Sequence, residues 1–328
     1  MTVLGIRLSA AGRTNATLAA AIAAAFLVFG LLAGDGLFTG AALRAMAFQM
    51  PELGLLSLAM MVTLLAGGIN LAVIATANLS ALAMAFVLTR FVPGTEGAAW
   101  VLWQVAALGA GAAVALAVGL LNGVLIAHLR VSPILATLGT MTLLEGIAVG
   151  TTRGGVIAGF PEPILWLGNG TIAGVHVALL LFAAAAVPIA AMLGRTRLGS
   201  AIYMIGSSEP ATRYSGIDTA RVLVTVQVVS SLLAWIAAIV MMARFNSANA
   251  SYGESYLLVT ILAAVLGGID PMGGFGKVGG LVLALVLLQV VSSGLNLLGI
   301  SPFLTLAIWG AILLAMAGMP EVRRRLVG

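Results

Sequence analysis

The sequence predicts an all-α integral membrane protein with about ten transmembrane helices, one for each long apolar run. Of the 328 residues, 62% are hydrophobic and only 8% are charged. Soluble domains carry roughly 25% charged residues, so this composition excludes an ordinary soluble protein. The polar residues are concentrated in short segments between the apolar runs, which is typical of a multi-span membrane domain. We therefore predict that residues 1–328 form a single transmembrane domain.

The predicted spans follow from the length of each apolar run, because about 20 apolar residues cross the hydrocarbon core. In chain order they cover residues 16–33, 53–66, 71–88, 99–127, 134–149, 172–193, 222–243, 256–266, 278–298 and 302–319. The first run has no cleavage-site pattern, so it is predicted to be a retained span and not a signal peptide. The second run is short, and its helix could begin before Pro51.

Glycine, proline and polar residues set the boundaries between these spans. Residues 67–70, Gly-Gly-Ile-Asn, separate the second span from the third and are expected to break the helix within the membrane. Arg130 and Pro133 mark the end of the fourth span. Residues 151–171 are rich in glycine and polar side chains, so this segment is predicted to stay outside the hydrocarbon core.

The arginines predict which side of the membrane each loop occupies. With the N-terminus inside and an even number of crossings, most basic residues lie on the inner side, as the positive-inside rule requires. The inner set is Arg7, Arg13, Arg130, Arg195, Arg197, Arg213, Arg221, Lys277 and the arginines at 323–325, and the outer set is Arg44, Arg90, Arg153 and Arg244. Both termini are therefore predicted to be cytoplasmic.

Residues 195–221 form the longest polar interruption of the chain, which we name the inner polar segment. It carries four arginines as well as Glu209 and Asp218, and unpaired charge is costly to bury in lipid. Ser207 or Ser208 is a predicted N-cap for a short helix that continues through Glu209 and Arg213. Two interpretations stay open: a structured docking surface for a partner, or a solvated connecting loop.

Several polar side chains fall within or at the ends of the predicted spans. They are Gln49, Asn70, Asn78, Gln104, Asn122, Glu145, Gln227, Gln289 and Asn296. Such side chains either hydrogen-bond between helices or line a wet cavity. The candidates for a path that carries a neutral polar solute are Asn70, Asn78, Gln49, Gln104 and Asn296. Glu145 is expected to pair with an arginine such as Arg153, or to be the ionisable site of an ion-coupled transporter.

The sequence lacks the side chains that most enzyme and metal sites need. It has no cysteine and only two histidines, so thiolate chemistry is excluded and no metal centre is expected. No GxxxxGK[ST] phosphate loop is present, so ATP that drives transport would have to be hydrolysed by another subunit. The basic residues behind the net charge of +5 are scattered between spans, and no nucleic-acid surface is predicted.

Two glycine-rich breaks are similar in sequence. Residues 66–70 read Ala-Gly-Gly-Ile-Asn, and residues 266–270 read Leu-Gly-Gly-Ile-Asp. Interrupted helices at corresponding positions of two halves indicate an internal repeat and a transport site. The alternative is a chance similarity between two glycine turns.

Four stretches carry a resemblance to a known family. They are residues 66–71 (AGGINL), 131–142 (VSPILATLGTMT), 198–209 with 215–217 (LGSAIYMIGSSE and SGI) and 294–302 (GLNLLGISP). Through them the chain resembles the membrane permease subunits of bacterial ABC importers for simple sugars, of the ribose, xylose, galactose and autoinducer-2 type, within the branched-chain amino acid/sugar permease superfamily. The resemblance covers nearly the whole chain and implies the helical bundle of a type II ABC importer permease.

The resemblance also implies partners and a location. The partners are a cytoplasmic ABC ATPase, a periplasmic solute-binding protein and a second permease, either a copy of this chain or a related chain. ATP and Mg²⁺ are then expected in the ATPase, and no cofactor in this chain. The location is the lipid of the bacterial inner membrane, crossed several times. The residues implied to couple to the ATPase are Gly206, Ser208, Glu209, Arg213 and Gly216.

The chain departs from the family pattern at the first glycine break. The family commonly has Asp after Gly-Gly-Ile and Ser two places later, whereas this sequence has Asn70 and Ala72. A neutral amide still bonds hydroxyl groups but provides no charged acceptor. This argues against a plain aldopentose as the solute, and a polyol, a modified sugar and another small polar compound stay open. An ion-coupled secondary transporter and a membrane scaffold that only recruits partners are the alternative functions.

Overall fold

The computed structural model describes the backbone of residues 10–327 and the side chains of residues 14–32 and 36–315. The α-helices are α1 (Ala10–Ala33), α2 (Gly40–Leu65), α3 (Val73–Phe91), α4 (Gly97–Ala127), α5 (Pro133–Thr152), α6 (Glu162–Asn169), α7 (Val177–Arg195), α8 (Arg197–Ser207), α9 (Glu209–Tyr214), α10 (Thr219–Phe245), α11 (Tyr256–Leu266), α12 (Val278–Leu297) and α13 (Pro302–Val327). The other elements are a 3-10 helix, η1 (Gly34–Phe38), and the strands β1 (Ile157–Ala158), β2 (Thr171–Ile172), β3 (Val175–His176) and β4 (Ser247–Ala248). The strands pair antiparallel, β1 with β4 and β2 with β3.

The predicted all-α membrane fold is confirmed. Within residues 10–327, eight helices are long and apolar enough to cross a membrane, namely α1 to α5, α7, α10 and α12. The apolar helix α11 and the apolar part of α13, Pro302–Ala315, are shorter. These ten helices occupy the ten predicted runs.

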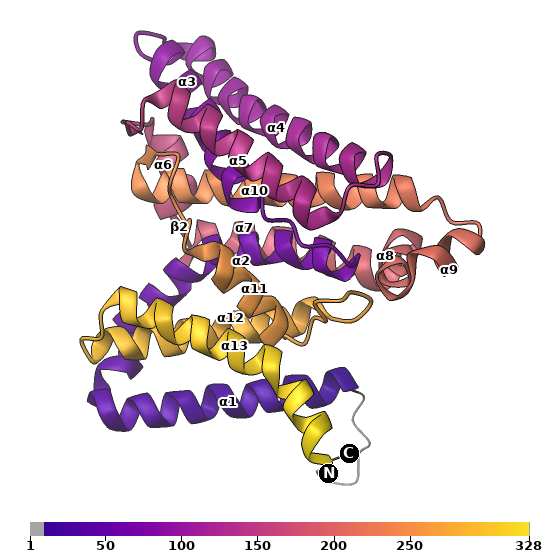
Figure 1. The fold of residues 1–328 in the computed structure, drawn as a ribbon. Coiled ribbons are helices and arrows are strands. Elements are labelled where there is room, and N and C mark those ends of the chain that lie inside the picture. The colour runs from indigo at the N-terminus through magenta and orange to yellow at the C-terminus, as the bar shows by residue number, and fades with distance from the viewer. Residues whose placement is uncertain (1–9, 328) are drawn as a thin grey trace.

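Helix α2 lies at the centre of the bundle. It packs against α10, α7, α11 and α12, and residues 54–65 are all buried. A helix that is apolar on every side belongs in the interior of a bundle. Figure 1 shows α3, α4, α5 and α10 on one side of α2, and α11, α12, α13 and α1 on the other. Helix α1 packs mainly on α12 and is largely exposed, which suits contact with lipid.

Small residues allow close packing between α4 and α10. A Cβ atom on Gly119 would lie 2.7 Å from the Cα of Val228, and one on Gly123 would lie 2.9 Å from the Cα of Val224. Neither position can hold a side chain without separating the two helices. In a bilayer the hydrophobic effect does not drive helices together, so close van der Waals contact of this kind stabilises the bundle.

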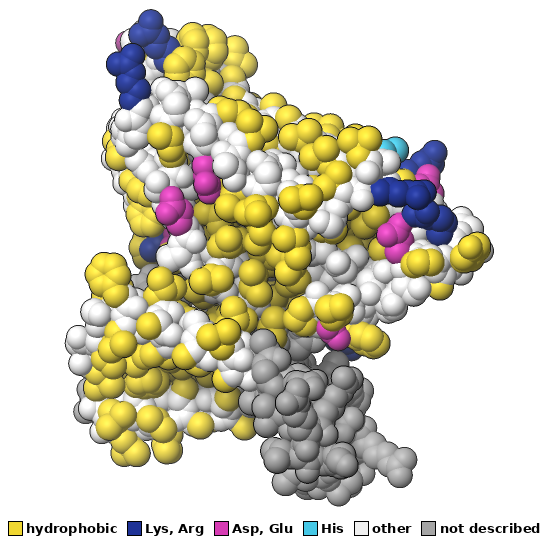
Figure 2. All heavy atoms as spheres, in the orientation of Figure 1, with side chains coloured by type: hydrophobic (Ala, Val, Ile, Leu, Met, Phe, Trp, Pro, Cys, Tyr) yellow, Lys and Arg dark blue, Asp and Glu magenta, His cyan; other side chains and the backbone are white. Residues whose placement is uncertain are grey.

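The long helices run between two ends of the molecule. Helices α8 and α9, the start of α1 and the end of α13 lie at one end, and α6 and β2 lie at the other (Figure 1). Figure 2 shows basic side chains gathered towards these two ends, with mainly apolar side chains between them. This distribution fits a protein whose middle is surrounded by lipid and whose two ends are exposed to water.

Two predicted boundaries differ from the structure. Helix α2 begins at Gly40 and continues through Pro51, so the start before Pro51 that was left open is the one observed, and not a start near residue 53. Proline inside a membrane helix is tolerated where neighbouring helices support the freed backbone. The earlier start places Glu52 within a buried helix, where no acid was predicted. The sixth span begins at Val177, not at residue 172, because β2 and β3 form a hairpin before it.

Candidate coupling surface and solute cavity

The inner polar segment folds into the two short helices α8 and α9. Thr196 is the N-cap of α8, and its Oγ1 accepts a hydrogen bond from the backbone N–H of Gly199 at 3.1 Å. Ser208 is the N-cap of α9, and its Oγ accepts from the backbone N–H of Ala211 at 3.4 Å. These caps stop one helix and start the next within a single residue. The predicted Ser208 cap is confirmed, and the segment is structured.

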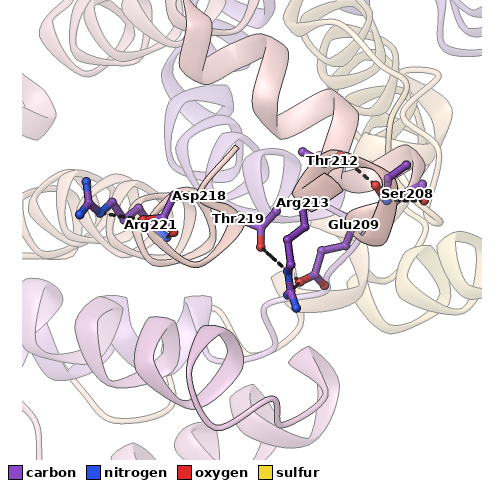
Figure 3. Close-up of polar contacts among 8 residues, drawn as sticks. Ser208, Glu209, Thr212, Arg213, Asp218, Thr219 and Arg221 are labelled. Atoms are coloured by element: carbon purple, nitrogen blue, oxygen red, sulfur yellow. Dashed lines mark hydrogen bonds and ion pairs between the residues drawn. The ribbon is translucent and has the colours of Figure 1, made fainter. Parts of the chain in front are cut away.

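Figure 3 shows the charged side chains Glu209 and Arg213 on α9 and Asp218 and Arg221 at the start of α10, all of which are exposed. Glu209 and Arg213 form an ion pair one turn apart, and the Nε of Arg213 donates to Thr219 Oγ1 at 3.4 Å. Asp218 caps α10 and pairs with Arg221 at 2.8 Å. Exposed pairs of this kind stabilise a fold by only about 0–1 kcal/mol, so their charges remain available to a partner.

Three backbone segments meet at the end of α8. We name this contact the glycine junction, and it consists of Gly67, Gly206, Gly273 and Gly274. A Cβ atom on Gly273 would lie 2.8 Å from the Cα atoms of both Gly67 and Gly206. A Cβ atom on Gly206 would overlap the carbonyl oxygen of Leu65 and the nitrogen of Gly274. Gly67, Gly273 and Gly274 also have positive φ angles, which glycine adopts without strain.

Two hydrogen bonds hold the glycine junction together. The backbone N–H of Gly274 donates to the carbonyl of Leu65 at 3.0 Å. The hydroxyl of Tyr203, on α8, donates to the carbonyl of Gly276 at 2.8 Å. Burial raises the pKa of the Tyr203 hydroxyl above its usual value, so it stays protonated as a donor at neutral pH. Helix α8 is therefore bonded to the loop between α11 and α12, and that loop is bonded to the end of α2.

The two glycine breaks have similar local geometry, offset by one residue in the motif. At the end of α2, the backbone N–H groups of Gly67 and Gly68 donate to the carbonyls of Leu64 and Thr63. At the end of α11, Gly268 and Ile269 donate in the same way to Val265 and Ala264, so the equivalent bonds come one residue later in the motif. These are Schellman C-caps. Beyond them, the side-chain oxygens of Asn70 and Asp270 accept from the backbone N–H two residues on, at 3.0 and 2.9 Å. The sequence similarity of the two breaks therefore extends to their structure.

A cavity lies beside α9. Its volume is about 580 Å³, and its lining includes Arg130, Pro133, Gly206, Glu209 and Met272. These residues come from the start of α5, from the inner polar segment and from the loop before α12, and Ala66 and Gly67 at the end of α2 also line the cavity. Three of the four stretches that carry the family resemblance therefore meet at this end of the molecule.

A larger cavity, about 640 Å³, lies towards the opposite end. It is lined by the first half of α2, the junction of α10 with α11, the last turns of α12 and the start of α13. The fourth resemblance stretch, 294–302, contributes Asn296 and Pro302. Gln289 on α12 donates to Oε1 of Gln49 on α2 at 3.1 Å and to Ser293 at 3.3 Å.

A buried charge cluster forms one wall of this cavity. Glu52 pairs with Arg244 at 2.8 Å, and the Tyr256 hydroxyl donates to the second oxygen of Glu52 at 2.7 Å. The guanidinium of Arg244 also lies 4.2 Å above the ring of Phe48. This cluster was not predicted from the sequence, because Glu52 was expected before a span and Arg244 in an outer loop. The only indication in the sequence was that the acid Glu52 and the base Arg244 each lie next to an apolar run.

The candidate path residues separate into two groups. Gln49 and Asn296 line the large cavity. Asn70 donates to Ser230 Oγ at 3.1 Å, and Asn78 donates to the carbonyls of Ala250 and Tyr252 at 2.7 and 2.9 Å. Gln104 donates to the carbonyl of Trp100 within its own helix. The last three side chains are buried between helices. Contact of any of the five with a solute stays a prediction.

The expected ion pair between Glu145 and Arg153 is not formed in the part of the chain that the structure describes. The two residues are eight positions apart on α5, and a rise of about 1.5 Å per residue separates them by about 12 Å along the helix axis. Arg153 is the left-handed C-cap of α5 and is exposed.

The sequence of this chain is similar to those of known proteins over most of its length. Residues 42–317 match the model of the family described as branched-chain amino acid transport system / permease component. The chain belongs to this permease family. The permease is 34% identical to the ribose import permease protein RbsC of Bacillus subtilis over 263 residues. The aligned region covers 80% of this chain and 79% of RbsC. No solved structure matches the permease.

Two further relatives also match the permease. The ribose import permease protein RbsC of Escherichia coli K12 is 35% identical over 212 residues, 63% of this chain and 66% of its own length. The autoinducer 2 import system permease protein LsrD of Photorhabdus temperata is 31% identical over 268 residues, 80% of this chain and 78% of its own length. The permease is thus a multi-pass membrane protein of a transport family.

Proposed function

We propose that this chain is the membrane-spanning subunit of an ABC importer that moves a small neutral polar solute, a sugar or a sugar-like compound, into a bacterial cell. A periplasmic binding protein delivers the solute to the end that carries the large cavity. A separate cytoplasmic ATPase, with its own ATP and Mg²⁺, drives the cycle. The matched family and the import permeases among the relatives support this proposal.

The observation that carries the proposal is the attachment of the inner polar segment to both glycine breaks. Helices α8 and α9 present exposed charges outward, and Gly206 at the end of α8 contacts Gly67 and Gly273. A displacement of α9 would therefore be transmitted to the ends of α2 and α11 through backbone contacts. Such contacts have no side chain that could change its rotamer and absorb the movement. A rigid-body movement of these helices is the kind of transition that opens one end of a bundle and closes the other.

The proposed orientation places α8 and α9 in the cytoplasm. The arginine distribution of the sequence supports it. The complex contains two permeases, either two copies of this chain or this chain and a related one. Gly206, Ser208, Glu209, Arg213 and Gly216 are proposed to lie at the ATPase interface, with Gly216 forming the turn between α9 and α10 at a φ of 82°.

Reconstitution tests the proposal. The permease is purified with the ATPase and binding protein encoded beside it and placed in liposomes. We expect ATP hydrolysis and solute uptake that both depend on the solute-loaded binding protein. Uptake by the permease alone, driven by a proton or sodium gradient without ATP, would instead establish an ion-coupled transporter.

A further inference from the structure

The polar side chains of α12 lie on one face at one end of the helix. Residues 278–288 are all apolar or glycine, whereas Gln289, Ser292, Ser293 and Asn296 follow at helical spacing. Residues three and four apart share a helix face, and all four side chains line the large cavity. Polar side chains of a membrane helix face partners or a wet space, and here the space is a cavity.

Part of this polar face has no partner within the described residues. Gln289 bonds Gln49 and Ser293, but the side chains of Ser292 and Asn296 make no hydrogen bond with any described residue. Asn296 is also exposed, at the end of α12 remote from α8 and α9. An amide supplies donors and an acceptor, and a serine hydroxyl supplies both kinds of group. These side chains can therefore bond a ligand that offers several hydroxyl groups.

The charges of the cavity compensate each other. Of the described lining residues, only Glu52 and Arg244 are charged, and they pair at 2.8 Å with both side chains nearly buried. Tyr256 satisfies the other carboxylate oxygen. A charged ligand would find no unpaired counter-charge in this lining, and freeing one by breaking the pair would leave a buried charge without its partner, which is costly. The cavity therefore favours an uncharged ligand.

The shape and the apolar lining suit a small ligand. The volume of about 640 Å³ falls in the usual range of ligand pockets, about 300–1,000 Å³. Trp309 and Phe303 of α13 and Tyr256 add aromatic surface to the polar face. A few convergent polar groups among apolar and aromatic side chains are typical of small-molecule sites.

We propose that the α12 face, with Gln49 opposite, is a solute-binding site within the permease for a neutral polyhydroxylated compound. Gln49, Gln289, Ser292, Ser293 and Asn296 bond the hydroxyl groups of the solute. This inference rests on the proposed function, because it assumes that solute enters at this end. It adds a defined site to the permease, beyond the site of the separate binding protein.

Single-cysteine labelling tests the site directly, because the natural chain has no cysteine. Ser292→Cys and Asn296→Cys are made separately in the assembled transporter, and a membrane-impermeant maleimide is added from the outside. Ribose, xylose, galactose, sorbitol and erythritol are the neutral probes, and leucine is the zwitterionic probe. At nine times its dissociation constant, a bound probe slows labelling about tenfold. Ser301→Cys is the matched control, since Ser301 lies at the same end but does not line the cavity.

We expect at least one neutral probe to slow the labelling of both cavity cysteines and to leave the Ser301→Cys rate unchanged. Equal rates with and without every neutral probe would overturn the proposed site, and protection by leucine alone would overturn the class of ligand. ATP hydrolysis stimulated by the loaded binding protein is measured in the same preparations. Normal stimulation without protection refutes only this inference, whereas loss of stimulation in the unmodified transporter refutes the proposed function.

Discussion

Gly206 at the end of α8 and Gly273 in the loop before α12 are in direct backbone contact. A Cβ atom on Gly273 would lie only 2.8 Å from the Cα of Gly206. Backbone contact leaves no side chain to rearrange, so a displacement of α8 must move this loop or break the contact. This relationship connects the surface proposed to meet the ATPase with two interrupted helices.

Replacing Gly206 with alanine is therefore expected to uncouple the transporter. The new methyl group overlaps the carbonyl oxygen of Leu65, and overpacking of this kind costs about 1–3 kcal/mol, which changes an equilibrium by a factor between about 5 and about 140. We expect solute-stimulated ATP hydrolysis to fall by a factor in that range in reconstituted complex. Gly194→Ala in α7 is the control, because a Cβ atom there meets no atom within 4 Å. Equal losses in both variants would contradict a specific role of the junction.

Exchanging the charges of α9 is expected to uncouple the permease without unfolding it. In the double variant Glu209→Lys with Arg213→Glu, opposite charges still face each other one turn apart, and the exposed pair contributes at most about 1 kcal/mol. A partner surface complementary to the original charges would meet the wrong signs. We expect unchanged thermal stability of the isolated permease and lost stimulation of ATP hydrolysis. Full stimulation would place the ATPase contact elsewhere.

Glu52→Gln is expected to destabilise the permease. The amide keeps the hydrogen bond from Tyr256 but leaves Arg244 buried without its counter-ion, and breaking a buried ion pair costs about 3–5 kcal/mol. Thermal unfolding in detergent should show a lower midpoint. Removing both charges with Glu52→Leu and Arg244→Met should recover much of the loss, whereas a double variant less stable than Glu52→Gln would show that the pair itself supplies the stability.

The orientation can be checked with one cysteine. Ser208→Cys places a thiol between α8 and α9, where the side chain is exposed. In intact cells an impermeant maleimide should not label it, and in inverted membrane vesicles it should. Asn296→Cys should give the reverse pattern, because it lies at the opposite end of the helices. Labelling of Ser208→Cys in intact cells would reverse the proposed topology and remove the ATPase contact.

The sequence predicted the elements of the fold well and the site only in part. Ten apolar runs, the helix break at Gly67 and the Ser208 cap depend on local composition and local hydrogen bonds. The start of α2 was predicted near residue 53, with a start before Pro51 left open, because Pro51 and Glu52 resemble a boundary when read locally. Neighbouring helices supply Arg244 and Tyr256 to that acid, and no local pattern contains those contacts.

The separation of the polar residues likewise needed the assembled bundle. Asn70 and Asn296 have the same side chain, yet Asn70 bonds Ala72 and Ser230 in the interior while Asn296 lies open in the cavity. By itself the sequence determined a membrane bundle of permease type, since hydrophobic length and family motifs are properties of the chain. Only the tertiary structure decided which amides face a cavity and that three distant glycines touch, because both depend on how helices far apart in sequence pack together.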